Sequence, residues 1–105
     1  MENRLQLVAS IVEKDTIRYT PAGIPVVSAR LQHSSRQVEA ETERAIEFEI
    51  PAIAIGAIAG QLDRLEPGQI QHFTGFMARR NRKSRTLVFH ITGITPAKTQ
   101  EQPFI

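Results

Sequence analysis

Five segments of this sequence alternate apolar and polar residues, and this period of two constrains the possible folds more than any other feature. Successive side chains of a β-strand point to opposite faces, so each segment is predicted to be a strand with one buried face. The predicted strands cover residues 4–13, 26–33, 46–55, 69–78 and 86–94. Between the third and the fourth, Ile58, Leu62 and Leu65 have the spacing of a short amphipathic helix within residues 56–66.

Turn residues separate these elements. Thr20-Pro21-Ala22-Gly23 precedes the second strand and Pro67-Gly68 ends the helix; proline fixes φ and glycine can take a positive φ, which suits tight turns. Residues 34–44 are polar and are predicted to form the tip of a long hairpin. Pro51 cannot donate a ladder hydrogen bond, so it predicts a bulge or an edge position in the third strand.

Three strands, one helix and two strands in 105 residues is the order of the OB-fold, a five-stranded barrel that binds oligonucleotides and oligosaccharides. We therefore predict an all-β chain with one OB-fold domain at residues 1–96, one short helix between strands three and four, and a loose tail at residues 97–105. In this fold the ligand lies across strands two and three, between the first and the fourth inter-strand loops.

The fourth of these loops concentrates positive charge. It holds five cations, namely Arg79, Arg80, Arg82, Lys83 and Arg85. The chain has 13 basic and 11 acidic residues, so the remainder of the chain is acidic without these five. A cationic loop beside the expected ligand face predicts a polyanionic partner, most often nucleic acid. The alternative is a charged loop that serves only solubility.

Three further basic residues are weaker candidates for the same site. Lys14 and Arg18 lie in the first inter-strand loop, on the ligand side of an OB-fold. Arg30 alternates outward on the second strand and could extend the cationic track. A pair with Glu47 or Glu49 on the neighbouring strand is an equal alternative for Arg30.

An acidic run marks the hairpin tip at Glu39, Glu41 and Glu43. These carboxylates would repel a DNA backbone. The simpler interpretation is a soluble hairpin tip. The sharper hypothesis is a docking surface for a basic partner protein, or for the basic loop of another copy.

Aromatic residues bear on how tightly a nucleic acid would be held, because single-strand binders stack bases on exposed rings, at about 1–3 kcal/mol per base. The chain has no tryptophan. Phe48, Phe76 and Phe89 are predicted to lie on the apolar faces of their strands. We therefore expect binding that is dominated by phosphate contacts, weak and insensitive to base sequence.

Several classes of function lack a sequence signature. There is no cysteine, which excludes disulfides and thiolate metal sites, and His33, His72 and His90 are too far apart in sequence to suggest a metal site. No phosphate-binding glycine loop, nucleophile elbow or carboxylate pair is present. No apolar stretch approaches the length of a membrane span, and the start lacks an export signal. We expect a non-enzymatic cytoplasmic protein without metal, cofactor or membrane contact.

Short motifs distributed over about residues 3–95 resemble the bacterial single-stranded-DNA-binding protein superfamily, and within it the primosomal branch. They are Asn3-Arg4-Leu5, Tyr19-Thr20-Pro21-Ala22-Gly23-Ile24-Pro25, Leu31-Gln32-His33-Ser34, Ile50-Pro51, Gly56, and Pro67-Gly68 through Gly75-Phe76. The resemblance implies an OB-fold homodimer that binds single-stranded DNA, contacts the primosomal helicase and other primosome proteins, and assists reloading of the replicative helicase at stalled forks.

Two other functions stay open at this point. One is an adaptor whose OB-fold mainly binds primosome proteins, with weak or vestigial affinity for nucleic acid. The missing stacking aromatics and the acidic hairpin favour it. The other is an RNA-binding module, because a cationic loop does not by itself detect a 2′-hydroxyl.

Overall fold

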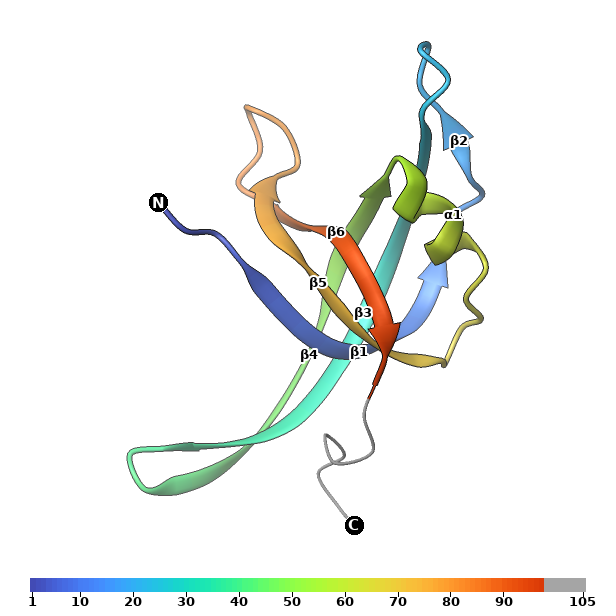
Figure 1. Cartoon of the computed structure of the whole chain (residues 1–105). Helices are drawn as coiled ribbons and strands as arrows, with labels where there is room; N and C mark the ends of the chain where they lie inside the picture. The colour runs from blue at the N-terminus through green and yellow to red at the C-terminus, as the bar shows by residue number, and fades with distance from the viewer. Residues whose placement is uncertain (98–105) are drawn as a thin grey trace.

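In the computed structural model, which describes residues 1–97, six strands and one helix follow one another along the chain (Figure 1). They are β1 (Leu5–Lys14), β2 (Arg18–Tyr19), β3 (Pro25–Glu39), β4 (Thr42–Ile55), α1 (Ala57–Asp63), β5 (Ile70–Arg79) and β6 (Leu87–Pro96). All five predicted strands and the predicted helix are confirmed. The tail expected at residues 97–105 lies outside the described residues, apart from Ala97.

The strands form one sheet in the order β1-β5-β6-β4-β3-β2, and an additional pairing of β1 with β3 closes it into a barrel. The barrel strands are β1, β3, β4, β5 and β6, and β2 adds a short edge beside β3. The pairing of β4 with β6 is parallel, whereas the other pairings are antiparallel. This closure confirms the predicted OB-fold.

Strand β1 changes partner along its length. Its residues 5–10 pair with β5 and its residues 10–14 pair with β3, with a shift of register between Ile11 and Glu13. Such a bulge bends a strand, which lets one strand serve both sides of a barrel. Among the pairings of the described chain, residues 5–9 have β5 on one side and no strand on the other.

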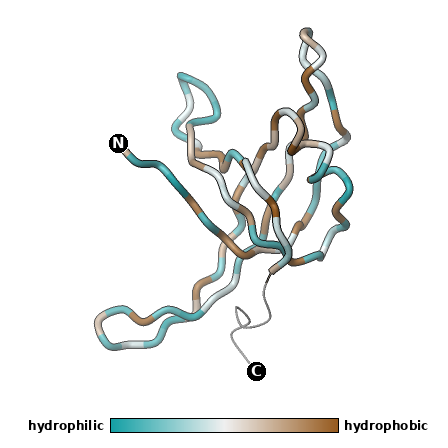
Figure 2. Tube along the Cα trace, in the orientation of Figure 1, coloured by the Kyte–Doolittle hydropathy of each residue, from teal (hydrophilic) through white to brown (hydrophobic). Residues whose placement is uncertain are grey.

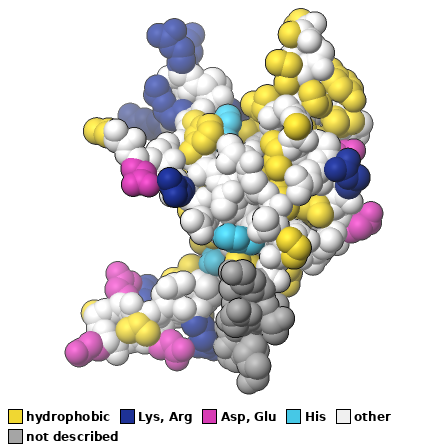
Figure 3. Space-filling view, in the orientation of Figure 1, with side chains coloured by type: hydrophobic (Ala, Val, Ile, Leu, Met, Phe, Trp, Pro, Cys, Tyr) yellow, Lys and Arg dark blue, Asp and Glu magenta, His cyan; other side chains and the backbone are white. Residues whose placement is uncertain are grey.

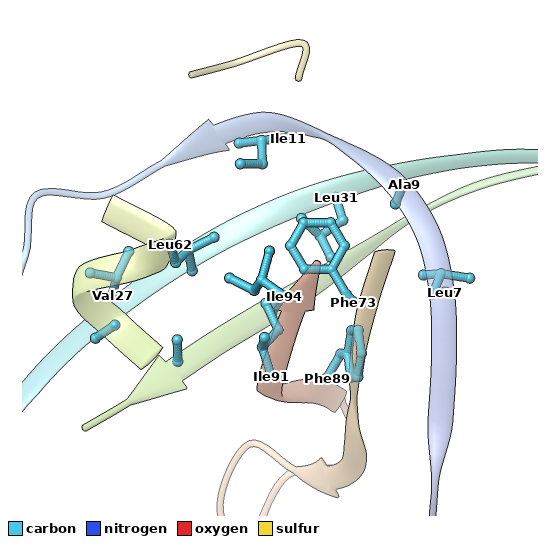
Figure 4. Packing of buried hydrophobic residues seen from close by; sticks show 13 residues of the cluster. Leu7, Ala9, Ile11, Val27, Leu31, Leu62, Phe73, Phe89, Ile91 and Ile94 are labelled. Atoms are coloured by element: carbon cyan, nitrogen blue, oxygen red, sulfur yellow. The ribbon is translucent and has the colours of Figure 1, made fainter. Parts of the chain in front are cut away.

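The core is filled by the inward faces that the alternation predicts. Phe73, Phe89, Ile11, Leu31, Leu62 and Val27 are the largest fully buried side chains. Figure 4 shows Leu31, Phe73 and Ile94 meeting in the space that the strands enclose. Burial of one such side chain is worth about 1.5–3 kcal/mol. Helix α1 closes one end of the barrel with Leu62.

Strand β5 approaches β6 closely at Gly75. A Cβ atom at this position would lie 1.8 Å from the backbone oxygen of His90, so no larger residue fits there. The register of β5 against β6 also shifts between Thr74 and Gly75. The glycine therefore allows the close pairing that places Phe76 opposite His90.

One long hairpin extends beyond the barrel, and we name residues 34–48 of β3 and β4 the arm (Figure 1). The pairing of β3 with β4 runs without a break from Val26 opposite Ile55 to Glu39 opposite Thr42. Predicted strand two ended at His33, so the hairpin was foreseen but the length of its strands was not. No helix in residues 1–97 is long and apolar enough to span a membrane.

The prediction for Pro51 is confirmed in one of its two alternatives. Pro51 lies in unbroken register with Arg30, and the pairing of β4 with β6 begins one residue later, at Ala52. Pro51 thus occupies an edge position, the second of the two alternatives. The alternation of the fifth predicted strand puts Leu87, Phe89 and Ile91 on one inward face; Phe89 and Ile91 are buried there, whereas Leu87 at the start of β6 is exposed.

Candidate nucleic-acid interface

A groove of about 590 Å³ runs over the outer faces of β3, β4 and β6. Its floor includes Ser28, Ile53 and His90. The connection between β1 and β3, which contains β2, borders one side with Arg18, and the β5–β6 loop borders another with Arg80. In barrel order β3 and β4 are strands two and three, and Arg18 and Arg80 lie in the first and fourth inter-strand connections, which is where the sequence predicted the ligand. The fifth barrel strand, β6, also lines the groove.

Three arginines that lie far apart in sequence meet at this groove. Arg18 of β2 donates a hydrogen bond to the Ser28 hydroxyl at 3.4 Å. Arg30 of β3 and Arg80 of the β5–β6 loop complete the set. Closure of the barrel therefore assembles positive charge on both sides of a floor that mixes polar and apolar side chains.

Arg30 is partly neutralised. Its Nε lies 3.8 Å from a Glu13 carboxylate oxygen and 3.9 Å from a Glu49 carboxylate oxygen. The predicted alternative of a pair with Glu49 is thereby confirmed. Asp15 also lines the groove. Exposed ion pairs contribute about 0–1 kcal/mol, so these carboxylates reduce the positive potential near Arg30 without locking its side chain.

The β5–β6 loop, residues 80–86, is held by its own hydrogen bonds. The Arg80 amide donates to the Thr86 carbonyl at 2.9 Å and closes the loop. Asn81 accepts from the Ser84 amide at its carbonyl, 3.2 Å, and from the Lys83 amide at its side chain, 3.0 Å. These are the bonds of a turn with a side-chain cap, and Arg82 lies at the middle of that turn.

The five cations of residues 79–85 are all exposed. Within the described residues, no ion pair involves any of them. Figures 2 and 3 show this loop as a hydrophilic projection covered by Lys and Arg side chains. The cluster therefore keeps its charge available, although Arg80 is the member that lines the groove and the other four lie on or beside the loop.

Lys14 takes a different position from the one predicted. Its ammonium donates to the carbonyl of Asp63, the last residue of α1. A cation at the C-terminal end of a helix is favourable because the last carbonyls lack partners. The structure thus places Lys14 outside the groove, and we leave it out of the proposed site.

Phe48 lies on the apolar face of its strand as predicted but is not buried there, whereas the prediction for Phe76 is wrong. Phe48 is 38% exposed and Phe76 is 37% exposed, whereas Phe89 is fully buried as predicted. Phe48 shares the inward face of β4, but at that point the arm has left the barrel, so the ring lies outside the core cluster of the described residues. Phe76 is on the outer face of β5, because Phe73 and Gly75 are the inward residues there.

Each exposed phenylalanine pairs with a histidine on the neighbouring strand. Phe76 stacks on His90 with ring centroids 4.9 Å apart and planes 12° apart. Phe48 meets His33 at 5.0 Å with the rings tilted by 33°. Sequence reasoning missed both pairs. The sequence did contain a signal for the first pair, because residues 72, 74 and 76 share one face of the strand. Phe76 therefore lies on the face of the polar His72 and Thr74 and not on that of Phe73.

The acidic run on the arm is partly paired within the arm itself. Glu39 lies 3.0 Å from Arg44, and Glu43 lies 3.8 Å from Arg36. Glu41 occupies the turn, where no ion pair of residues 1–97 reaches it. Figure 3 shows acidic and basic side chains interspersed along this projection. No cluster of metal-binding side chains occurs in the described part of the chain.

The barrel, its groove and the cationic loop beside it define an OB-fold protein of the single-strand-binding class. A family model described as "Another single-strand binding protein family" matches residues 3–93. Replication restart protein PriB of Nitrosomonas europaea is 43% identical over 91 residues, which cover 85% of this chain and 84% of that protein. PriB of Neisseria meningitidis serogroup B is 37% identical over 97 residues, covering 91% and 96%.

A comparison with solved structures indicates the same family. The three-dimensional structure of PriB from Ralstonia solanacearum is 46% identical, with a TM-score of 0.84, and the match covers 93% of this chain and all of that one. The chain therefore belongs to the single-strand binding proteins and, among them, to the PriB family of replication restart proteins. The resemblance found in the sequence motifs is confirmed.

Proposed function

We propose that this protein binds single-stranded DNA as an accessory factor of the replication-restart primosome. Membership in the PriB family supports the cellular role. The observation that carries the molecular role is the groove over β3 and β4, with Arg18 and Arg80 on two of its sides and four further cations on or beside one bordering loop.

The charge arrangement suits an unpaired strand. Phosphates would contact Arg80 and the loop cations Arg79, Arg82, Lys83 and Arg85, with Arg18 and Arg30 across the groove. Each phosphate contact on a single strand contributes about 0.7 to the slope of log affinity against log salt. If all five cations of residues 79–85 took part, the slope would be about −3.5.

Membership in the PriB family supports a proposal for the protein partners. We propose contacts with the primosomal helicase and other primosome proteins, in the cytoplasm and without catalysis by this chain. We also propose a homodimer that forms through β1, whose residues 5–9 have one edge that no strand of residues 1–97 pairs with. An open strand edge invites pairing with a second copy.

A titration of fluorescent oligomers tests the DNA role. Single-stranded DNA, duplex DNA and RNA of the same length are compared at two salt concentrations by anisotropy. We expect a salt-dependent preference for single strands, and an Arg80→Ala variant should weaken it. Arg64→Ala is the matched control, since Arg64 is exposed at the end of α1 and does not line the groove. No binding by the wild type at low salt would overturn the proposal.

A second candidate function is the protein adaptor with weak nucleic-acid binding. The carboxylates of Glu13 and Asp15 in the groove and those of Glu39, Glu41 and Glu43 on the arm favour it. A pull-down of primosome proteins with a Glu39→Gln/Glu41→Gln/Glu43→Gln variant tests the arm as a docking surface. Unchanged capture would count against it.

A further inference from the structure

Phe76 lies just beyond the groove, next to a residue that lines it. His90 of β6 is part of the groove, and Phe76 of β5 is its direct register partner on the outer face of the sheet. Gly75 brings the two strands close enough for the rings to stack nearly parallel. The outer face therefore continues from the groove across β6 onto β5 as one surface.

The barrel does not account for the exposed ring at position 76. Phe73 and Phe89 already fill this part of the core, and both are fully buried. Phe76 points away from that core and is 37% exposed while it stacks on His90. A large aromatic ring at the border of a cationic groove is a surface that can accept a flat apolar partner.

We propose that Phe76, supported by His90, is a base-stacking platform that extends the path of an unpaired strand from the groove across β6 to β5. This inference rests on the proposed function. Bases present two flat faces, so stacking on a ring stabilises binding whatever the base is. Arg80 follows the end of β5 on the same border of the groove and would hold the phosphates of the stacked nucleotides.

The second histidine–phenylalanine pair supplies an internal control. Phe48 is exposed to the same degree as Phe76 and also contacts a histidine, but it lies on the arm and does not line the groove. Its partner His33 is bonded to the Val8 carbonyl at 2.7 Å and to the Ser35 hydroxyl at 2.8 Å. Exposure alone thus does not distinguish the two rings, whereas position relative to the groove does.

An abasic oligomer separates stacking from phosphate contact. Oligothymidylate and an abasic strand of the same length are titrated against the wild type, Phe76→Ala, Phe76→Leu, Phe76→Tyr and Phe48→Ala. The wild type should bind oligothymidylate more tightly than the abasic strand. Loss of the ring in Phe76→Ala and Phe76→Leu should weaken oligothymidylate binding about tenfold, as expected for one stacked base, and leave abasic binding unchanged. Phe76→Tyr and Phe48→Ala should behave as the wild type.

The outcomes distinguish the platform from the proposed function. If Phe76→Leu binds oligothymidylate as tightly as the wild type while Arg80→Ala weakens both oligomers, the platform is wrong and the DNA role stands. If the wild type binds neither oligomer, both are wrong. Circular dichroism and thermal unfolding of each variant show whether a loss reflects the fold, and Phe76→Leu keeps apolar bulk at the position for this purpose.

Discussion

The β5–β6 loop and the arm are hairpin ends of opposite charge, and they differ in what their charges contact. In the loop and at Arg79 beside it, five exposed cations have no ion pair within the described residues, and the loop backbone is held by the capped turn of Asn81. On the arm, Glu39 and Glu43 are paired with arginines of the arm itself. Charge that is paired internally offers less to a ligand than charge that is not, so the loop is the better binding element.

The two hairpin ends also differ in backbone. The arm turns through Ala40 and Glu41, which have φ of 53° and 66°. Successive positive φ values are those of the tight turn that matches the twist of a hairpin, for which asparagine and glycine are the favoured residues. The arm turn therefore has a conformational free-energy cost that the β5–β6 loop does not have. Both differences, in charge and in backbone, can be tested.

The largest effect is expected from removal of the loop charges. An Arg80→Ala/Lys83→Ala/Arg85→Ala variant should lose at least about tenfold in affinity for single-stranded DNA at low salt, and its salt slope should become shallower by about 2. Anisotropy titrations at several salt concentrations measure both quantities.

The matched control for that variant removes three cations elsewhere. Arg36→Ala/Arg44→Ala/Arg64→Ala lowers the net charge by the same amount and leaves the loop intact. It should retain most of the affinity and the steeper slope. Equal losses in both variants would show that net charge, and not the position of the loop, drives binding.

Relief of the arm turn should have the next largest effect. An Ala40→Asn/Glu41→Gly variant removes non-glycine side chains that disfavour a left-handed backbone, and we expect the arm to gain about 1 kcal/mol. Amide hydrogen exchange of Val38 and Glu43, which face one another across the arm, should slow by a corresponding factor. Faster exchange would contradict the interpretation of a strained turn.

The acidic run is expected to matter less for DNA. Glu39→Gln/Glu41→Gln/Glu43→Gln should leave affinity for single-stranded DNA within about twofold of the wild type, because the carboxylates are exposed and screened by salt. A large gain in affinity would mean that the arm lies beside the bound strand. The same titration series used for the loop measures this.

The smallest effect is expected for a single arm pair. Arg44→Ala breaks the 3.0 Å pair with Glu39, in which the two side chains are 58% and 72% exposed. Exposed pairs of this kind stabilise by about 0.5 kcal/mol, so the midpoint of urea unfolding should barely move. A loss above about 2 kcal/mol would show that the arm is coupled to the barrel more tightly than its exposure indicates.

The sequence predicted the barrel because each core strand has one apolar face. It could not predict how far β3 extends, since residues 34–39 are polar except for Val38 and show no alternation of apolar and polar residues. The same limit explains Phe48, whose apolar alternation continues although the barrel has ended. The two-residue strand β2 is too short to leave any pattern.

The sequence predicted the cations of the candidate site but not the contacts that form between strands. The loop cations stand out as a cluster in the sequence, and the known order of an OB-fold places that cluster beside strands two and three. The meeting of Arg18 with Arg80 and the stacking of Phe76 on His90 depend on barrel closure and on register, which no local pattern specifies. The position of Lys14 differs from the predicted one because its hydrogen-bond partner is the backbone carbonyl of Asp63, which is available only once helix α1 has folded.

The parallel seam of β4 with β6 sets the order in which the molecule can become functional. Residues 52–54 of β4 can pair only after residues 89–91 of β6 have been synthesised, and β6 is the last of the five barrel strands along the chain. Pairings between residues that are distant in sequence form slowly. Until that seam forms, His90 and Arg80 have no groove to border. A nucleic acid that binds across the paired β4 and β6 would stabilise the closed barrel by mass action, and so would oppose separation of β6 from β4.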